Sequence, residues 1–244
     1  MSVRLMRSFR SYIGTASFDS YSPREDIEWS NFWWDSANKE ADKRYLLIGD
    51  STIRMVRHTL ADTIKLPVDM IGSSSNLDDI LFVAQVDAFF CSELYRRYDA
   101  IFVQIGHHGR VGRDGGSFEK SDEDNFEQSL TAFLQFLSQF SDRIVVESIF
   151  DAVVPPTKRL RRWMVKHHFR PEEFDDSINV VTRRKNEIAR SVAAKLDNAD
   201  CRFKFLDINA IVASQDFLHV DHIHYEGRAV PFIVKTMMAE LSEN

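Results

Sequence analysis

Short apolar runs alternate along the chain with longer segments in which apolar residues recur every three or four positions. Several of the short runs end at a glycine, which is typical of buried strands that stop at a tight turn. The longer segments are typical of helices with one buried face, as in 52–64, where Ile53, Val56, Leu60 and Ile64 share a face. The pattern predicts strands at 45–48, 68–71, 100–105, 143–148 and 203–206, and helices at 52–64, 77–90, 123–140, 178–196 and 228–241.

This alternation of strands and helices predicts β-α-β units, because two parallel strands need a connection long enough to hold a helix. We therefore expect an α/β fold, a three-layer α/β/α sandwich whose central parallel sheet is covered by helices on both faces. Residues 150–176 follow neither period and are expected to be irregular. No stretch is apolar over the length that a bilayer requires.

The first 43 residues differ from the rest of the chain. They are polar and then place four aromatic residues close together, Trp29, Phe32, Trp33 and Trp34. We expect residues 1–43 to form an N-terminal arm whose aromatic side chains pack on a main domain of residues 44–244. A sugar-binding surface built from these tryptophans is the alternative. The segment has no apolar stretch typical of a secretory signal, so a cytoplasmic location is the default expectation.

Composition narrows the class of function. The chain has 244 residues, of which 44% are hydrophobic and 28% charged, which suits one domain with a sizeable core. The formal net charge is −6, whereas proteins that bind nucleic acid usually carry an excess of positive charge. Cys91 and Cys201 are the two cysteines, too few for a disulfide framework. We expect neither nucleic acid nor a membrane span, and the oligomeric state is left open.

Candidate catalytic residues follow the predicted strands, at the sheet edge where α/β proteins bind ligands. Ser51 would begin helix 52–64, whose free N–H groups favour a developing oxyanion. A serine hydroxyl becomes nucleophilic when a base removes its proton. His224 can be that base, and Asp221, three residues before it, can orient the imidazole. Taken alone, Ser51 could equally be a helix cap.

Three short motifs carry a resemblance to a known family. Gly-Asp-Ser follows the first predicted strand at 49–51, Gly72 follows the second, and Asp-x-x-His at 221–224 precedes the last helix. In this order they resemble the SGNH (GDSL-like) hydrolase superfamily over residues 44–244. The resemblance implies a flavodoxin-like fold, an acyl-enzyme mechanism, and neither metal nor cofactor. It also implies Ser51 as nucleophile and oxyanion donor, Gly72 as second donor, and Asp221 with His224 as the rest of a triad.

The third motif departs from the family. The family has Gly-x-Asn-Asp after the third strand, and this chain has Gly106-His107-His108-Gly109. His108 thus stands where the family's Asn donates to the oxyanion, and an imidazole can also donate one hydrogen bond. Some polysaccharide-modifying relatives make the same replacement, and residues 49–54 resemble the start of sugar O-acetylesterase and O-acetyltransferase domains. Residues expected beside a substrate are Asp50, Arg54, His107 and His222.

Three other features have competing interpretations. His219, His222 and His224 with Asp221 could suggest a metal site, but their order does not match a metal-hydrolase motif. The glycine-rich segment 109–116 lacks the ending of a phosphate loop and is expected to lie beside the site. The basic residues around Arg161 and Arg162 are expected on a solvated helix face. They could instead bind an acidic sugar or the phosphates of coenzyme A.

Together these features predict a serine-dependent carboxylester hydrolase that acts on an O-acylated carbohydrate or another small ester. One alternative is a carbohydrate O-acyltransferase with the same triad, using an acyl donor such as acetyl-CoA. These two differ in how well the closed site excludes water, which a sequence does not record. A second alternative is a non-catalytic carbohydrate-binding protein on this fold.

Overall fold

The computed structural model describes residues 8–13, 29–91, 97–108, 117–156, 158–168 and 171–242. The glycine-rich segment 109–116 therefore lies outside the described residues. The strands of the described part are β1 (Ser30–Trp33), β2 (Tyr45–Gly49), β3 (Val68–Ser73), β4 (Ala100–Gln104), β5 (Arg143–Glu147) and β6 (Arg202–Leu206). Its helices are η1 (Phe9–Ser11), α1 (Ser51–Ile64), α2 (Ile80–Phe90), α3 (Lys120–Leu137), α4 (Arg159–Lys166), α5 (Asp176–Leu196), α6 (Ile208–Ala213) and α7 (Ala229–Ser242).

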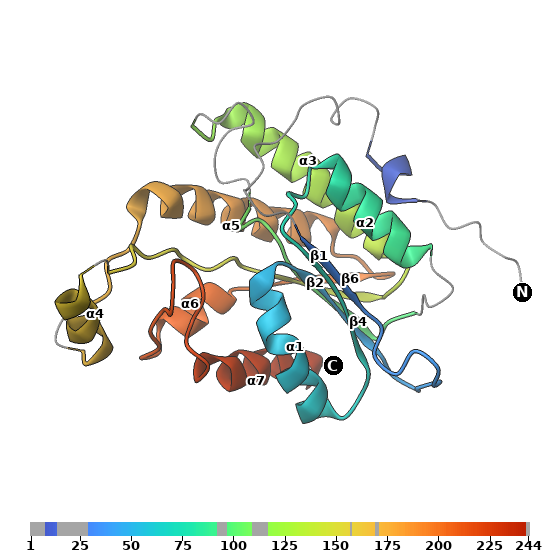
Figure 1. Ribbon diagram of the computed structural model, residues 1–244. Coiled ribbons are helices and arrows are strands. Elements are labelled where there is room, and N and C mark those ends of the chain that lie inside the picture. Colours follow the sequence, from blue (N-terminus) through green and yellow to red (C-terminus); the bar gives the residue numbers. More distant parts are fainter. Residues whose placement is uncertain are drawn as a thin grey trace, which may run out of the picture.

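The strands form one sheet in the order β1-β3-β2-β4-β5-β6, with helices on both faces (Figure 1). β2 to β6 are parallel, so the predicted α/β/α fold with a central parallel sheet is confirmed. β1 pairs antiparallel with β3 at the edge, where Asn31 lies opposite Gly72. The division of the chain at residue 43 stays a prediction, although part of the first segment lies in the sheet.

The strand order explains how the helices divide between the two faces. After β2 the chain adds β3 on one side of β2. It then crosses to the other side of β2, where it adds β4, β5 and β6 in order. Because crossovers are right-handed, this reversal puts α1 on one face and α2, α3 and α5 on the other. α6 and α7 then join α1 (Figure 1). The reversal makes the carboxyl end of β2 a topological switch point, where such sheets bind ligands.

Each face of the sheet has its own apolar core. The core under α2, α3 and α5 is rich in phenylalanine, and Phe9 of η1 packs into it against Phe133 at 5.0 Å between ring centroids. Trp34, just after β1, stacks on Phe89 of α2 at 4.9 Å. The core under α1, α6 and α7 is mostly aliphatic. Within the described ranges, no helix is long and apolar enough to cross a membrane.

Two α-helices fall where the sequence pattern predicts none. α4 lies inside the segment 150–176 that we expected to be irregular, and its pattern is weak because Val165 is its only buried residue. α6 has six residues, too few for a helical period to be recognised. Asp207 caps it by accepting a hydrogen bond from the backbone N–H of Ala210 at 3.1 Å.

Candidate active site

The turn between β2 and α1 places Ser51 at the start of a helix. Asp50 is the N-cap residue of α1, and its carboxylate accepts hydrogen bonds from the Thr52 backbone N–H at 2.9 Å and the Thr52 hydroxyl at 2.7 Å. Gly49 is required just before, because a Cβ there would lie 2.3 Å from the backbone oxygen of Gln104. The side chain of Ser51 is thereby left at the carboxyl edge of the sheet.

Ser51, His224 and Asp221 form a continuous hydrogen-bonded chain. The Oγ of Ser51 lies 2.6 Å from Nε2 of His224, and Nδ1 of His224 lies 2.8 Å from Oδ2 of Asp221. The sequence separates Ser51 from His224 by 173 positions, so the fold itself brings them together. An ionised carboxylate can only accept. Nδ1 therefore carries the proton, and Nε2 is left with a lone pair that faces the serine hydroxyl.

Asp221 is held in its ionised form. Its Oδ1 accepts the backbone N–H groups of Ile223 at 3.0 Å and His224 at 2.9 Å. Partial burial by itself raises the pKa of this carboxyl, but those two backbone donors and the His224 ring together lower it below its usual value. Asp221 therefore stays a hydrogen-bond acceptor over the neutral pH range and keeps the imidazole in one tautomer.

The loop that carries Asp221 and His224 is anchored by Glu172. The Glu172 carboxylate accepts the backbone N–H of His219 at 2.8 Å and lies 2.7 Å from its Nδ1. The buried His219 ring packs on Tyr225, with 4.0 Å between ring centroids. The backbone N–H of Val220 donates to the carbonyl of His224 at 2.8 Å. These contacts close residues 218–226 into a tight hairpin with Asp221 at its tip.

Two of the predicted oxyanion donors, Gly72 and His108, lie in β3 and after β4, the strands on either side of β2. Gly72 is the fifth residue of β3 and is paired in register with Gly49 of β2. A Cβ on Gly72 would meet the indole of Trp29 at 3.1 Å, so Trp29 lies directly over this position. His108 follows Gly106, whose φ of +128° suits glycine. The buried Lys185 of α5 holds this turn by donating to the carbonyls of Gly106 at 3.1 Å and His108 at 3.0 Å.

The four residues expected beside a substrate have different surroundings. Asp50 and His107 are buried, and Nε2 of His107 lies 4.0 Å from Oδ2 of Asp50, so both contact the protein interior. Arg54 is exposed, and its guanidinium lies 5.0 Å from the centre of the Trp29 ring. His222 lies 3.5 Å from Asp175. Arg54 is thus the one of the four that is exposed next to the Gly72 position.

The three histidines near the C-terminus contact three different carboxylates, Glu172 for His219, Asp175 for His222 and Asp221 for His224. Each pair is separate, and no group of three metal-ligating side chains converges in the part of the chain that the structure describes. The His224 pair is the one that reaches Ser51.

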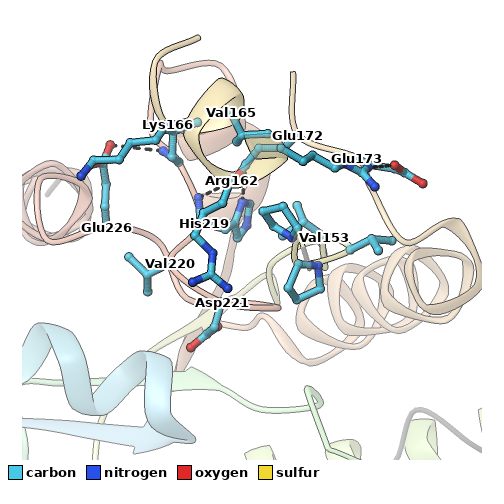
Figure 2. A pocket seen from close by; sticks show the side chains of 15 residues that line it. Val153, Arg162, Val165, Lys166, Glu172, Glu173, His219, Val220, Asp221 and Glu226 are labelled. Carbon is cyan, nitrogen blue, oxygen red and sulfur yellow. Dashed lines mark hydrogen bonds and ion pairs between the residues drawn. The ribbon is translucent and has the colours of Figure 1, made fainter. Parts of the chain in front are cut away.

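A pocket of about 390 Å³ is lined by Asp221 but not by Ser51 or His224. Figure 2 shows its wall of α4 residues on one side and the 218–221 segment on the other. Arg162 and Lys166 of α4 line it, and so do Val220 and Asp221. The pocket therefore has the basic helix α4 on one wall and Asp221 on another.

Sequence reasoning did not identify Trp29 as a neighbour of Gly72, Lys185 as the support of the His108 turn, or Glu172 as the anchor of the Asp221 loop. All three act through contacts with residues far away in the chain. A lysine on the apolar face of helix 178–196 was one available signal, because lysine is rarely buried without a partner. Nothing in the local pattern marks Glu172.

Solved structures with a similar fold are found for this chain, whereas comparisons of its sequence find no match. No family model and no curated protein matches the chain. A Streptococcus pneumonia protein provisionally described as a platelet activating factor is 14% identical, with a TM-score of 0.56 over 82% of this chain and 85% of that one. A catalytic mutant of Axe2, an acetylxylan esterase from Geobacillus stearothermophilus, is 11% identical, with a TM-score of 0.53 over 84% and 96%.

LAE5, an alpha/beta hydrolase enzyme from the metagenome of Lake Arreo, Spain, is 14% identical, with a TM-score of 0.52 over 84% of this chain and 97% of that one. The likeness covers nearly the whole length of LAE5 and of Axe2, so the described elements correspond to a complete fold of that type. At these identities the chain shares the fold of known esterases and hydrolases.

Proposed function

We propose that the protein is a serine-dependent carboxylester hydrolase that removes acyl groups from a carbohydrate. The observation that carries the proposal is the hydrogen-bonded chain from Ser51 through His224 to Asp221. The alternative role of Ser51 as a mere helix cap is not needed, because Asp50 already caps α1. A cap would also have no use for a hydrogen bond to His224. The metal-dependent alternative is disfavoured by the separate partners of the three histidines.

The geometry suits a two-step acyl transfer. His224 Nε2 accepts the hydroxyl proton while Ser51 Oγ bonds to the acyl carbon. The imidazolium then donates that proton to the sugar oxygen as the ester C–O bond breaks, which releases the sugar with a free hydroxyl. Water repeats the two steps, which releases the acid and restores Ser51. The negative oxygen of each tetrahedral intermediate would be stabilised by the Ser51 backbone N–H, Gly72 and His108.

The structural relatives support the same chemistry and substrate class. The catalytic mutants of Axe2 replace a serine, an aspartate or a histidine, the residue types of the proposed triad, and the aspartate precedes the histidine by three positions there as it does here. Axe2 acts on acetylxylan according to its description. An acetylated polysaccharide is therefore the first substrate to test.

The test is trapping of the nucleophile together with turnover. We expect a fluorophosphonate to add one phosphonyl group to Ser51, located by peptide mass spectrometry, and wild-type protein to release acetate from acetylated xylo-oligosaccharides. Activity that is unchanged by the inhibitor, or a label on another serine, would contradict the triad. Repeating the reaction with a free sugar and acetyl-CoA measures transfer. Net transfer that exceeds hydrolysis would overturn the hydrolase assignment in favour of the transferase.

Replacing Glu172 by alanine should slow catalysis without removing any proposed catalytic group. The variant loses both hydrogen bonds that hold His219, so the loop carrying Asp221 and His224 gains freedom. We expect kcat to fall about tenfold, since small misplacements of catalytic groups are costly. KM should change little, and Glu172→Gln, which keeps an acceptor for the backbone N–H, should recover part of kcat. Equal kcat in wild type and Glu172→Ala would show that the loop holds its shape without this anchor.

A further inference from the structure

The segment that forms α4 concentrates positive charge in an otherwise acidic chain. Residues 158–168 contain five lysines and arginines and no acidic residue, while the whole chain has a net charge of −6. Arg161 forms an ion pair with Glu173. Arg162 and Lys166 are exposed, and the structure gives neither an ion pair among the residues it describes. Two cations on this helix are therefore available to a ligand.

These two cations line the pocket next to the proposed triad. Arg162 and Lys166 form one wall, and Val220 and Asp221 of the hairpin form another. Figure 2 shows the Arg162 side chain running along the pocket in the direction of Asp221. The hydrogen bonds of one imidazole, 2.6 Å and 2.8 Å long, separate Ser51 from Asp221. The pocket wall that Asp221 forms therefore lies two hydrogen bonds away from Ser51.

None of the four carboxylates that line the pocket forms an ion pair with Arg162 or Lys166 among the described residues. Their pairs are Glu173 with Arg161, Glu172 with His219, Glu226 with Arg228 and Asp221 with His224. A carboxylate that entered the pocket would meet two cationic side chains that have no ion-pair partner among the described residues. Apolar surface is also present, since Val220 is 67% exposed and lines the same pocket.

We propose that this pocket is a subsite for an anionic sugar unit, so that the preferred substrate is an ester of an acidic carbohydrate whose carboxylate pairs with Arg162 and Lys166. That this ligand is a substrate rests on the proposed function. The binding of an acidic oligosaccharide in the pocket does not depend on the proposed function. An arginine suits this task because its guanidinium meets a carboxylate with two parallel hydrogen bonds. A neutral oligosaccharide would leave both cations solvated and gain nothing from them.

The experiment compares an O-acetylated oligogalacturonate with an O-acetylated oligogalactoside of the same length, which differs by the carboxylates. We expect wild type to have a higher kcat/KM on the acidic ester, and raised salt to reduce that preference through screening. In Arg162→Gln/Lys166→Gln the acidic-to-neutral ratio of kcat/KM should fall about tenfold, because exposed charge pairs contribute roughly 0.2 to 1 kcal/mol each.

The matched control is Lys158→Gln/Arg159→Gln, which removes the same charge from the same segment at positions that do not line the pocket. It should leave the ratio unchanged. A wild-type ratio near one, or an equal loss in the control pair, would overturn the subsite. If wild type binds vesicles containing phosphatidylglycerol, both variant pairs lose that binding equally, and the acidic ester is not preferred, α4 would instead be assigned to a lipid surface.

Calorimetric titration with unacetylated oligogalacturonate separates this inference from the proposed function. If no ester is cleaved but the acidic oligosaccharide binds and Arg162→Gln/Lys166→Gln weakens that binding about tenfold, the subsite stands and the hydrolase assignment fails. If esters are cleaved but neither oligosaccharide binds better than the other, the hydrolase assignment stands and the subsite fails.

Discussion

Ser51→Ala is expected to abolish ester hydrolysis, with kcat falling on the order of 10⁴- to 10⁶-fold, the loss seen when serine hydrolases lose a member of the triad. The alanine keeps the cap on α1, because Asp50 supplies it. The fold should therefore survive, and the loss should be purely chemical. With p-nitrophenyl acetate as substrate, any turnover left in the variant measures what the oxyanion donors and substrate binding still contribute.

The same proposal predicts that the losses do not add. His224→Ala leaves Ser51 without a base, so it should cost nearly as much as Ser51→Ala, and the double variant should be no slower than either single one. Asp221→Asn should also be severe, because an amide nitrogen facing Nδ1 favours the tautomer that carries its proton on Nε2. That proton would point at the Ser51 hydroxyl and block its activation.

An exposed serine provides the control for these variants. Ser214 lies at the end of α6, away from the pocket and the triad, and Ser214→Ala should keep full activity. Multiplicative losses in the Ser51→Ala/His224→Ala variant would mean that the two side chains act independently. Turnover that survives undiminished in Ser51→Ala would exclude Ser51 as the nucleophile, whatever the activity of the wild type.

Periodicity predicted the fold well where burial is continuous. β2 to β5 are buried almost throughout, so their apolar runs stand out from the helical segments between them. β6 is only partly buried. β1 was missed because it is a short edge strand whose burial is only partial. Its pairing with β3 supplies the hydrogen bonds that make it a strand, and a local pattern does not record partners as distant as Ser73 is from Ser30.

The sequence predicted the catalytic residues of the candidate site, but not the residues that hold them in place. Ser51 and the Asp221–His224 pair each lie in a short motif at a turn, where few other roles require those residue types together. Their supports have no motif. Glu172 reaches His219 across 47 positions, and Lys185 reaches His108 across 77. The predicted irregular segment also hid α4, because a helix with one buried residue leaves no apolar stripe.

A buried carboxyl in the core should make stability depend on pH. Glu147 is the last residue of β5 and is 3% exposed. Because side chains alternate along a strand, it faces the same side as Val145, toward the core under α1 and α7. Its Oε1 has no hydrogen-bond partner among the described residues. Burial raises the pKa of Glu147 to about 8, so the folded protein holds this carboxyl protonated at neutral pH.

Glu147→Gln is therefore expected to stabilise the protein in alkaline solution and to change little in acid. The unfolded chain loses the Glu147 proton near its ordinary pKa of 4.5, and the folded chain keeps it up to about pH 8. Between those values the unfolded state binds fewer protons, so the free energy of unfolding falls as pH rises. At about 1.4 kcal/mol per pKa unit, the loss by pH 8 is on the order of 4 kcal/mol.

Urea unfolding of wild type and Glu147→Gln at several pH values from 4.5 to 8.5 measures this effect. The two curves of unfolding free energy should meet near pH 4.5 and separate steadily above it, with the glutamine variant more stable. Glu123→Gln is the control, because hydrogen bonding to Arg184 lowers the pKa of Glu123. Its contribution is present above its ordinary pKa and is lost only as pH falls, so it should not alter the slope between pH 5 and 8. Parallel curves for wild type and Glu147→Gln would mean that the Glu147 carboxylate reaches solvent or a cation when it ionises.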